Sequence, residues 1–166
     1  ISHEELRYNR LKHSFDALNY AISDVEINRI SDCYIDLLPE HNHLFDGAFE
    51  ILDYLKLKYR LHIITNGFAE VQYKKMNNAQ LTPYFTTITN SEMAGVKKPN
   101  PVIFEYALDL ANAQKESSIM IGDSLDADVQ GALDVGLDAI FFNENKSDTF
   151  TDIKQINHLL ELKKYL

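Results

Sequence analysis

Residues 118–132 read SIMIGDSLDADVQGA, and this stretch decides the fold. The apolar residues 119–121 suit a buried strand and run directly into Gly122 and Asp123, and Asp128 follows five positions later. A parallel strand that ends in Gly-Asp places the carboxylate at its C-terminal edge, where open α/β sheets bind ligands. Acids on the turn after such a strand supply the oxygen ligands that magnesium prefers. The stretch therefore predicts a parallel α/β fold with an acidic, cation-binding edge.

The rest of the chain alternates helical and strand patterns around this motif. Apolar residues at helical spacing predict two amphipathic helices at 4–19 and 25–38, before a polar linker at 39–42. Strands separated by helical stretches indicate βαβ units, and hence a Rossmann-like parallel sheet with flanking helices. The predicted helices of this region are 47–58, 68–78, 101–112, 127–135 and 153–165, and the predicted strands are 60–65, 86–89, 118–122 and 138–143.

Composition limits the classes of protein to consider. The 166 residues, 45% of them hydrophobic, suit one domain or one domain with a small appendage. A net charge of −9 argues against a nucleic-acid partner, whose binding surface would be basic. No apolar run approaches the ~20 residues of a membrane span, so we expect no membrane partner. Cys33 is the single cysteine, and we therefore expect a reducing, cytoplasmic location.

The segment LHIITNG at 61–67 places a hydroxyl and a turn at a strand end. Thr65 closes the apolar run, and Asn66 and Gly67 lead into the next helix. A hydroxyl and free backbone N–H groups at a helix N-terminus form an anion site, most often for phosphate. The alternative is that Thr65 and Asn66 only cap that helix.

The segment GVKKPNPVIF at 95–104 places a lysine before a helix. Asn100 is a plausible N-cap and Pro101 a natural first helical residue, so Lys98 should point toward the same sheet edge. An ammonium group can hold a phosphate and neutralise a neighbouring carboxylate. The alternative is that Lys98 is an ordinary exposed lysine.

The acidic turn at 122–128 has an alternative of its own, in which its acids only complement the dipole of the helix that follows.

In this order the threonine, the lysine and the Gly-Asp turn resemble the motifs of the haloacid dehalogenase superfamily of phosphohydrolases. The hydrophobic-T-N-G segment at Thr65 matches its second motif, and K-P-x-P at Lys98 matches its third. GDxxxxD at Asp123 and Asp128 matches its fourth. The similarity extends from about residue 44 to 143, and TNGF and GDSLDADVQGA are most similar to the pyrimidine 5'-nucleotidases.

This resemblance implies a division into a partial helical cap at 1–44 and a superfamily core at 45–166. It implies hydrolysis of a small phosphorylated metabolite, such as a nucleoside 5'-monophosphate, through an aspartyl-phosphate with Mg²⁺ as cofactor. Lys98, Thr65 and Asp123 would be the catalytic residues in this chain. The phosphate would be held by Thr65, Asn66, Gly67 and Lys98, and the metal by Asp123 and Asp128.

The resemblance also implies two aspartates after a first strand, the nucleophile and, two residues later, the general acid and base. No apolar strand followed by Asp-x-Asp stands before residue 61. We therefore expect the first strand, the nucleophile and half of the cap to be missing, and this chain alone to be inactive. The family places that strand between those ending at Thr65 and Asp123. We expect the gap to be closed by the associated N-terminal segment, by strand exchange with a partner, or by rearrangement of the sheet.

Two other functions remain open from the sequence. A carbon–halogen hydrolase on the same scaffold would also carry an S/T-N-G turn, but it needs no metal and usually lacks the Gly-Asp acid pair. A non-catalytic binding or regulatory module would keep the fold without the nucleophile. Phe15, Tyr20 and Tyr34 have the helical spacing typical of packing, with stacking on a nucleobase as the alternative.

Overall fold

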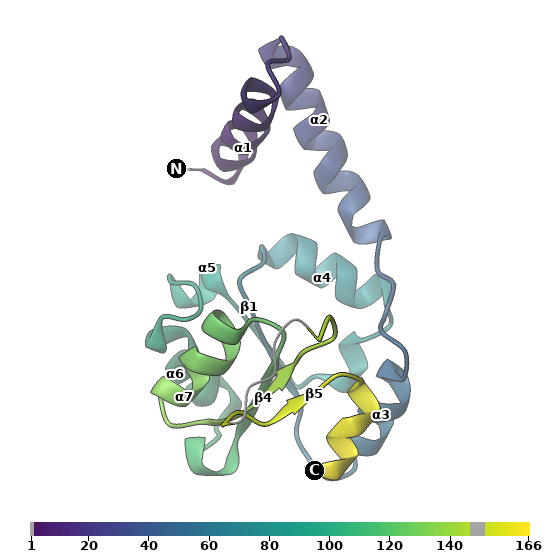
Figure 1. The fold of residues 1–166 in the computed structure, drawn as a ribbon, viewed down its shortest axis with the longest axis vertical. Coiled ribbons are helices and arrows are strands. Elements are labelled where there is room, and N and C mark those ends of the chain that lie inside the picture. Colours follow the sequence, from purple (N-terminus) through teal and green to yellow (C-terminus); the bar gives the residue numbers. More distant parts are fainter. Residues whose placement is uncertain (1, 147–151) are drawn as a thin grey trace. The chain divides into compact units, whose positions relative to one another are not determined.

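The computed structural model describes residues 2–146 and 152–166, and the chain divides into two compact units, Ile1–Asn42 and His43–Leu166. The first unit holds α1 (His3–Ala17), α2 (Asp24–Leu37) and a short 3-10 helix at Leu38–Glu40 (Figure 1). Both predicted helices are confirmed to within two residues at each end. Each begins at a serine N-cap, and Ser23 forms a reciprocal capping box with Glu26.

The two helices of the first unit bury little apolar surface between them. No residue of α1 is buried, and on α2 only Ile27 and Ser31 are. Polar contacts join the pair: Arg7 Nε donates to Ser31 Oγ over 3.1 Å, and the Tyr8 hydroxyl donates to Asp24 over 2.6 Å. About half of the large apolar side chains described in this unit are consequently exposed.

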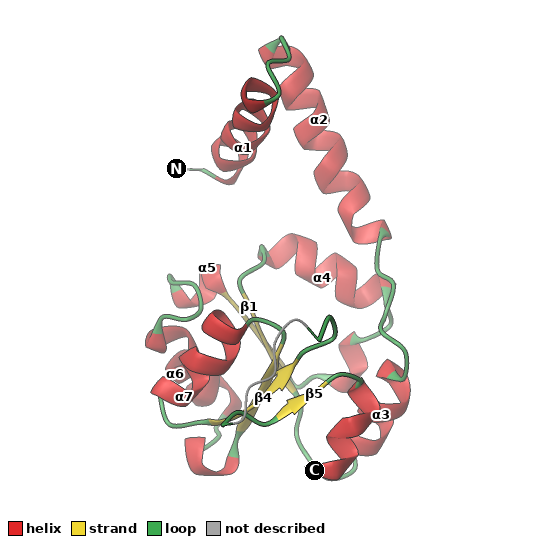
Figure 2. Ribbon diagram, viewed as in Figure 1, coloured by secondary structure: helices red, strands yellow, loops and turns green. Residues whose placement is uncertain are grey.

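The second unit alternates strands and helices (Figure 2). Its sheet strands are flanked by helices, as the sequence predicts for βαβ units. The strands are β1 (His62–Thr65), β2 (Thr87–Asn90), β3 (Ile119–Gly122), β4 (Asp138–Phe142) and β5 (Gln155–Ile156). The α-helices are α3 (Ala48–Leu55), α4 (Ala69–Asn78), α5 (Ser91–Ala94), α6 (Pro101–Ala111) and α7 (Gly131–Asp134). A π-helix covers Leu125–Gln130, and 3-10 helices cover Thr82–Tyr84, Lys115–Ser117 and Leu159–Lys164.

Every strand pairing is parallel, which confirms the α/β class. β1 pairs with β2, with His62 opposite Thr87 and Thr65 opposite Asn90. β3, β4 and β5 form a second sheet in that order. Within residues 2–146 and 152–166, β1 and β3 do not pair with each other, so the strands form two sheets rather than one.

In the part of the chain that the structure describes, β1 and β3 each have one edge without a strand partner. Strands of a parallel sheet are normally buried on both faces, yet every residue of these two is only half-buried. In β4, which lies between two partners, the last four residues are buried. The Thr86 N–H donates to the Leu61 carbonyl. Because every second residue of a parallel strand bonds to the same neighbour, the backbone N–H and carbonyl of Ile64 point away from β2. Within the described residues β1 and β3 do not pair across the position of the expected first strand, and closure by an N-terminal segment or by a partner stays a prediction.

β4 carries the core of the second unit. Its side chains alternate between two apolar clusters, with Ala139 and Phe141 on one face and Ile140 and Phe142 on the other. α6 supplies Ile103 and Phe104 to the first cluster. The second cluster is completed by α3, β5 and the C-terminal 3-10 helix, which lies beside α3 (Figure 1). β3 packs against both clusters, and the turn that follows it packs against the first.

The predicted helix at 153–165 is wrong. Residues 155–156 form β5, and a 3-10 helix follows at Leu159–Lys164. The outer edge of β4 overrides the local helical pattern, since the Phe141 N–H donates to the Lys154 carbonyl and the Asn143 N–H to the Ile156 carbonyl, both over 2.8 Å. The predicted helix at 127–135 is also divided, because its first part is the π-helix and only its end is α7.

Candidate functional site

Lys98 joins the end of β1 to the turn after β3. Its Nζ lies 2.6 Å from Asp128 Oδ1 and donates to the Ile64 carbonyl over 2.8 Å. The pair is nearly sealed from solvent, with 10% of the Lys98 side chain and 6% of the Asp128 side chain exposed. Two charges held this far from water interact strongly, because little solvent screens them. Lys98 is therefore not the ordinary exposed lysine that its sequence neighbourhood allows.

Thr65 lies next to this contact, as the last residue of β1. Its Oγ1 accepts a hydrogen bond from the Gly67 N–H over 3.0 Å, which leaves the hydroxyl hydrogen available to donate. Neither Thr65 nor Asn66 caps the helix that follows, because α4 has Phe68 at its N-cap position and no side-chain cap. Helix N-termini without a side-chain cap are positions where anions commonly bind.

Asp128 is directed inward by the turn between β3 and the π-helix. Ser124 caps this helix with its Oγ on the Ala127 N–H, and its own N–H donates to Asp128 Oδ2 over 3.2 Å. The Val129 N–H donates to the Ser124 carbonyl five residues earlier, which is the π-helical spacing. Gly122 makes room for this arrangement, because a Cβ there would lie 2.3 Å from Asp128 Oδ2.

Asp123 is a carboxylate of this turn that faces solvent. It is exposed, whereas the charge of Asp128 is already met by Lys98. Asp126 is exposed as well. Over the described ranges 2–146 and 152–166, no three His, Cys, Asp or Glu side chains gather into a group that could hold a metal ion. Magnesium often takes only one or two protein carboxylates and completes its shell with water and substrate phosphate, so Asp123 fits as one ligand of such a site.

The predicted site residues thus fall into two groups. Lys98 and Asp128 are in direct contact, and Thr65 adjoins the carbonyl that Lys98 binds. Asn66 reaches Lys98 through its side chain, while the Gly67 N–H binds Thr65. Asp123 lies on the same turn as Asp128 and is exposed. The Ile64 carbonyl and Ser124 are functional neighbours that motif reasoning did not single out.

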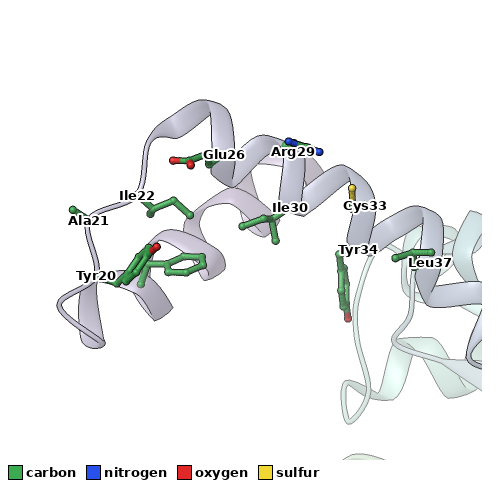
Figure 3. Close-up of a pocket in the computed structure, with 10 residues that line it drawn as sticks. Tyr20, Ala21, Ile22, Glu26, Arg29, Ile30, Cys33, Tyr34 and Leu37 are labelled. Atoms are coloured by element: carbon green, nitrogen blue, oxygen red, sulfur yellow. The ribbon is translucent and has the colours of Figure 1, made fainter.

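The first unit contains a groove of about 590 Å³ beside α2 (Figure 3). The rings of Phe15 and Tyr20 lie 5.7 Å apart at its wall, and Tyr20 and Tyr34 are 63% and 50% exposed. The aromatic side chains at helical spacing are therefore largely not packed into a core. Glu26 and Arg29 are the charged residues of the lining.

Comparison with known proteins identifies the family. Residues 3–142 match the model of the family described as Haloacid dehalogenase-like hydrolase. The chain belongs to this family, a class of hydrolases. The match includes the threonine, lysine and Gly-Asp segments whose contacts are described above.

Individual relatives refine this assignment. The chain is 31% identical over 144 residues to pyrimidine 5'-nucleotidase YjjG of Escherichia coli, covering 86% of this chain and 62% of that protein. It is 38% identical over 101 residues to glyceraldehyde 3-phosphate phosphatase of Pyrococcus abyssi, covering 60% of this chain and 42% of that protein. The chain thus spans 62% and 42% of the length of these two relatives, less than two thirds of either.

A solved structure is similar over the whole chain. The crystal structure of YfnB from Bacillus subtilis, bound to magnesium, has a TM-score of 0.87 and 30% sequence identity, and the match covers 100% of this chain and 73% of that one.

None of the helices in the described part of this chain has the length and apolar character needed to cross a membrane.

Proposed function

We propose that this chain is the phosphate-binding and metal-binding part of a magnesium-dependent phosphomonoester hydrolase. The observation that carries the proposal is the buried Lys98 ammonium, held between the Ile64 carbonyl at the end of β1 and Asp128 after β3. Ligands of parallel α/β sheets bind at this end of the strands. The similarity to YjjG and to the glyceraldehyde 3-phosphate phosphatase supports phosphate esters as the substrate class.

Each residue of the site has a role in this proposal. The Thr65 hydroxyl and the backbone N–H of Asn66 donate to phosphate oxygens, while the Gly67 N–H orients the Thr65 oxygen, and Lys98 offsets the phosphate charge. Asp123 holds Mg²⁺, which when bound supplies positive charge beside the phosphoryl group. Asp128 keeps Lys98 in place by its ion pair.

Two features extend the proposal to substrate and location. The likeness to the pyrimidine 5'-nucleotidase YjjG supports a nucleoside 5'-monophosphate as substrate. Cys33 is free and exposed, which fits the reducing conditions of the cytoplasm.

The complete active site would require one more strand, between β1 and β3. Both strands are parallel members of their sheets, each with an open and half-buried edge. An extended apolar segment in this position would pair with both and join the two sheets. The nucleophilic aspartate would stand at its C-terminal end, facing Lys98. Without it, this chain binds phosphate but does not hydrolyse the ester.

Hydrogen exchange tests the extra strand. In this chain the backbone amides of β1 and β3 should exchange faster than those of β4, which has partners on both sides. A peptide with an apolar strand followed by Asp-x-Asp should slow exchange in β1 and β3 and leave β4 unchanged, whereas a scrambled peptide should do neither. If β1 and β3 already match β4 in protection, the inferred strand has no place.

Phosphate titration tests the site itself. With Mg²⁺ present, Lys98→Met should weaken binding of inorganic phosphate at least about tenfold, because hydrogen bonds to charged groups contribute about 1.5–3 kcal/mol each. The neighbouring Lys97 is exposed and serves as the matched control, so Lys97→Met should change the dissociation constant less than about twofold. Equal effects of the two substitutions, or phosphate release from an ester that persists in EDTA, would count against the proposal.

A further inference from the structure

The side-chain amide of Asn66 forms two hydrogen bonds with the backbone of Lys98. Its Oδ1 accepts from the Lys98 N–H over 2.7 Å, and its Nδ2 donates to the Lys98 carbonyl over 3.1 Å. Both bonds are at least partly buried, and they connect residues 32 positions apart in the chain. One side chain thus satisfies both polar backbone groups of a single residue.

β1 and the turn after it therefore bind both the backbone and the ammonium group of Lys98. Asn66 fixes the backbone, and two residues earlier the Ile64 carbonyl accepts from the ammonium. The Ser91 hydroxyl donates to the Asn66 carbonyl over 3.4 Å, which holds the turn from a third element. A lysine side chain has several rotatable bonds, so its charge stays in one place only if its two ends are both fixed.

We propose that Asn66 is a positioning residue that sets the location of the Lys98 ammonium through the Lys98 backbone. It acts through its side chain, which therefore does not need to touch the phosphate. The proposal rests on the proposed function only for the consequence that phosphate binding depends on Asn66. The placement of Lys98 itself can be measured without any ligand.

The neighbouring Asn100 provides a matched control. Its Oδ1 accepts from the Val102 N–H and caps α6, so it lies two residues from Lys98 without bonding to it. Asn66→Ala removes both amide bonds to Lys98, whereas Asn100→Ala removes only a helix cap. Loss of a cap destabilises the fold in general and does not move Lys98 specifically.

The first readout is the NMR signal of the Lys98 ammonium in the ligand-free protein. A buried, ion-paired ammonium exchanges its hydrogens slowly enough to be followed by its ¹H–¹⁵N signal. We expect Asn66→Ala to shift or broaden this signal and Asn100→Ala to leave it in place. If Asn66→Ala does not fold, Asn66→Gln decides the question, because it keeps the amide but displaces it by one methylene and should also shift the signal.

The second readout is titration with inorganic phosphate and Mg²⁺. Asn66→Ala should weaken phosphate binding by about tenfold, as expected for the loss of two hydrogen bonds that hold the cation, and Asn100→Ala by less than about twofold. An unchanged Lys98 signal in both Asn66 variants would overturn the positioning role. If the unaltered protein binds no phosphate, the proposed function fails, while the Lys98 signal still decides the role of Asn66.

Discussion

Asp128→Asn is expected to lower the free energy of unfolding by several kcal/mol, because it breaks the buried ion pair with Lys98. The substitution leaves the Lys98 ammonium 10% exposed and without its carboxylate. Removing one partner of a buried ion pair costs about 3–5 kcal/mol, because the remaining charge stays in a poorly solvated place. Urea denaturation monitored by circular dichroism measures the change. We expect a lower midpoint with little change in slope.

Two further variants separate the ion pair from a general effect of the turn. Asp126 lies on the same turn but is exposed, so Asp126→Asn should change stability by less than about 0.5 kcal/mol. Adding Lys98→Met to Asp128→Asn removes the unpaired charge, and this double variant should be more stable than Asp128→Asn alone. A double variant no more stable than the single one would show that Asp128 does not act through Lys98.

Gly122→Ala should have the second largest effect. A Cβ at this position would lie 2.3 Å from Asp128 Oδ2 and 2.5 Å from its Cγ, closer than real atoms approach. Asp128 must then move away from Lys98 and from the Ser124 N–H. Overpacking alone costs about 1–3 kcal/mol, and the disturbed ion pair adds to it. The same denaturation experiment measures the loss.

Gly67 supplies the comparison for Gly122→Ala. A Cβ there would meet only the flexible side chain of Gln72, which can turn aside, so Gly67→Ala should be much less destabilising. Combining Gly122→Ala with Asp128→Asn should cost less than the sum of the two separate changes, since both disturb the same contact. Strict additivity would mean that Gly122 matters for some other reason.

Local patterns in the sequence were enough to predict most of the fold. The apolar run before Gly122 is β3, and Asn100 and Pro101 begin α6 as their side-chain chemistry suggests. These elements were predictable because capping and strand burial depend on neighbouring residues. β5 was missed because only the edge of β4, distant in the sequence, makes an extended backbone favourable there. A contact of this kind has no signature within 153–165 itself.

The sequence predicted which residues belong to the candidate site, but it did not predict most of the contacts among them. The motifs named Thr65, Lys98 and Asp128, but no spacing rule indicates that the ammonium binds the Ile64 carbonyl. Nor does the letter N in T-N-G reveal that the Asn66 amide turns toward the Lys98 backbone. Contacts across 32 residues depend on how two loops meet, which local sequence does not encode.

The open edges of β1 and β3 have a consequence for how this protein behaves in concentrated solution. Unpaired strand edges can pair with strands of other chains. β1 and β3 are half-buried and carry no Lys, Arg, Asp or Glu that would oppose such pairing. The net charge of −9 makes copies repel one another, and added salt screens that repulsion beyond about 10 Å at 0.1 M. Low ionic strength is therefore the condition that best keeps such copies from aggregating.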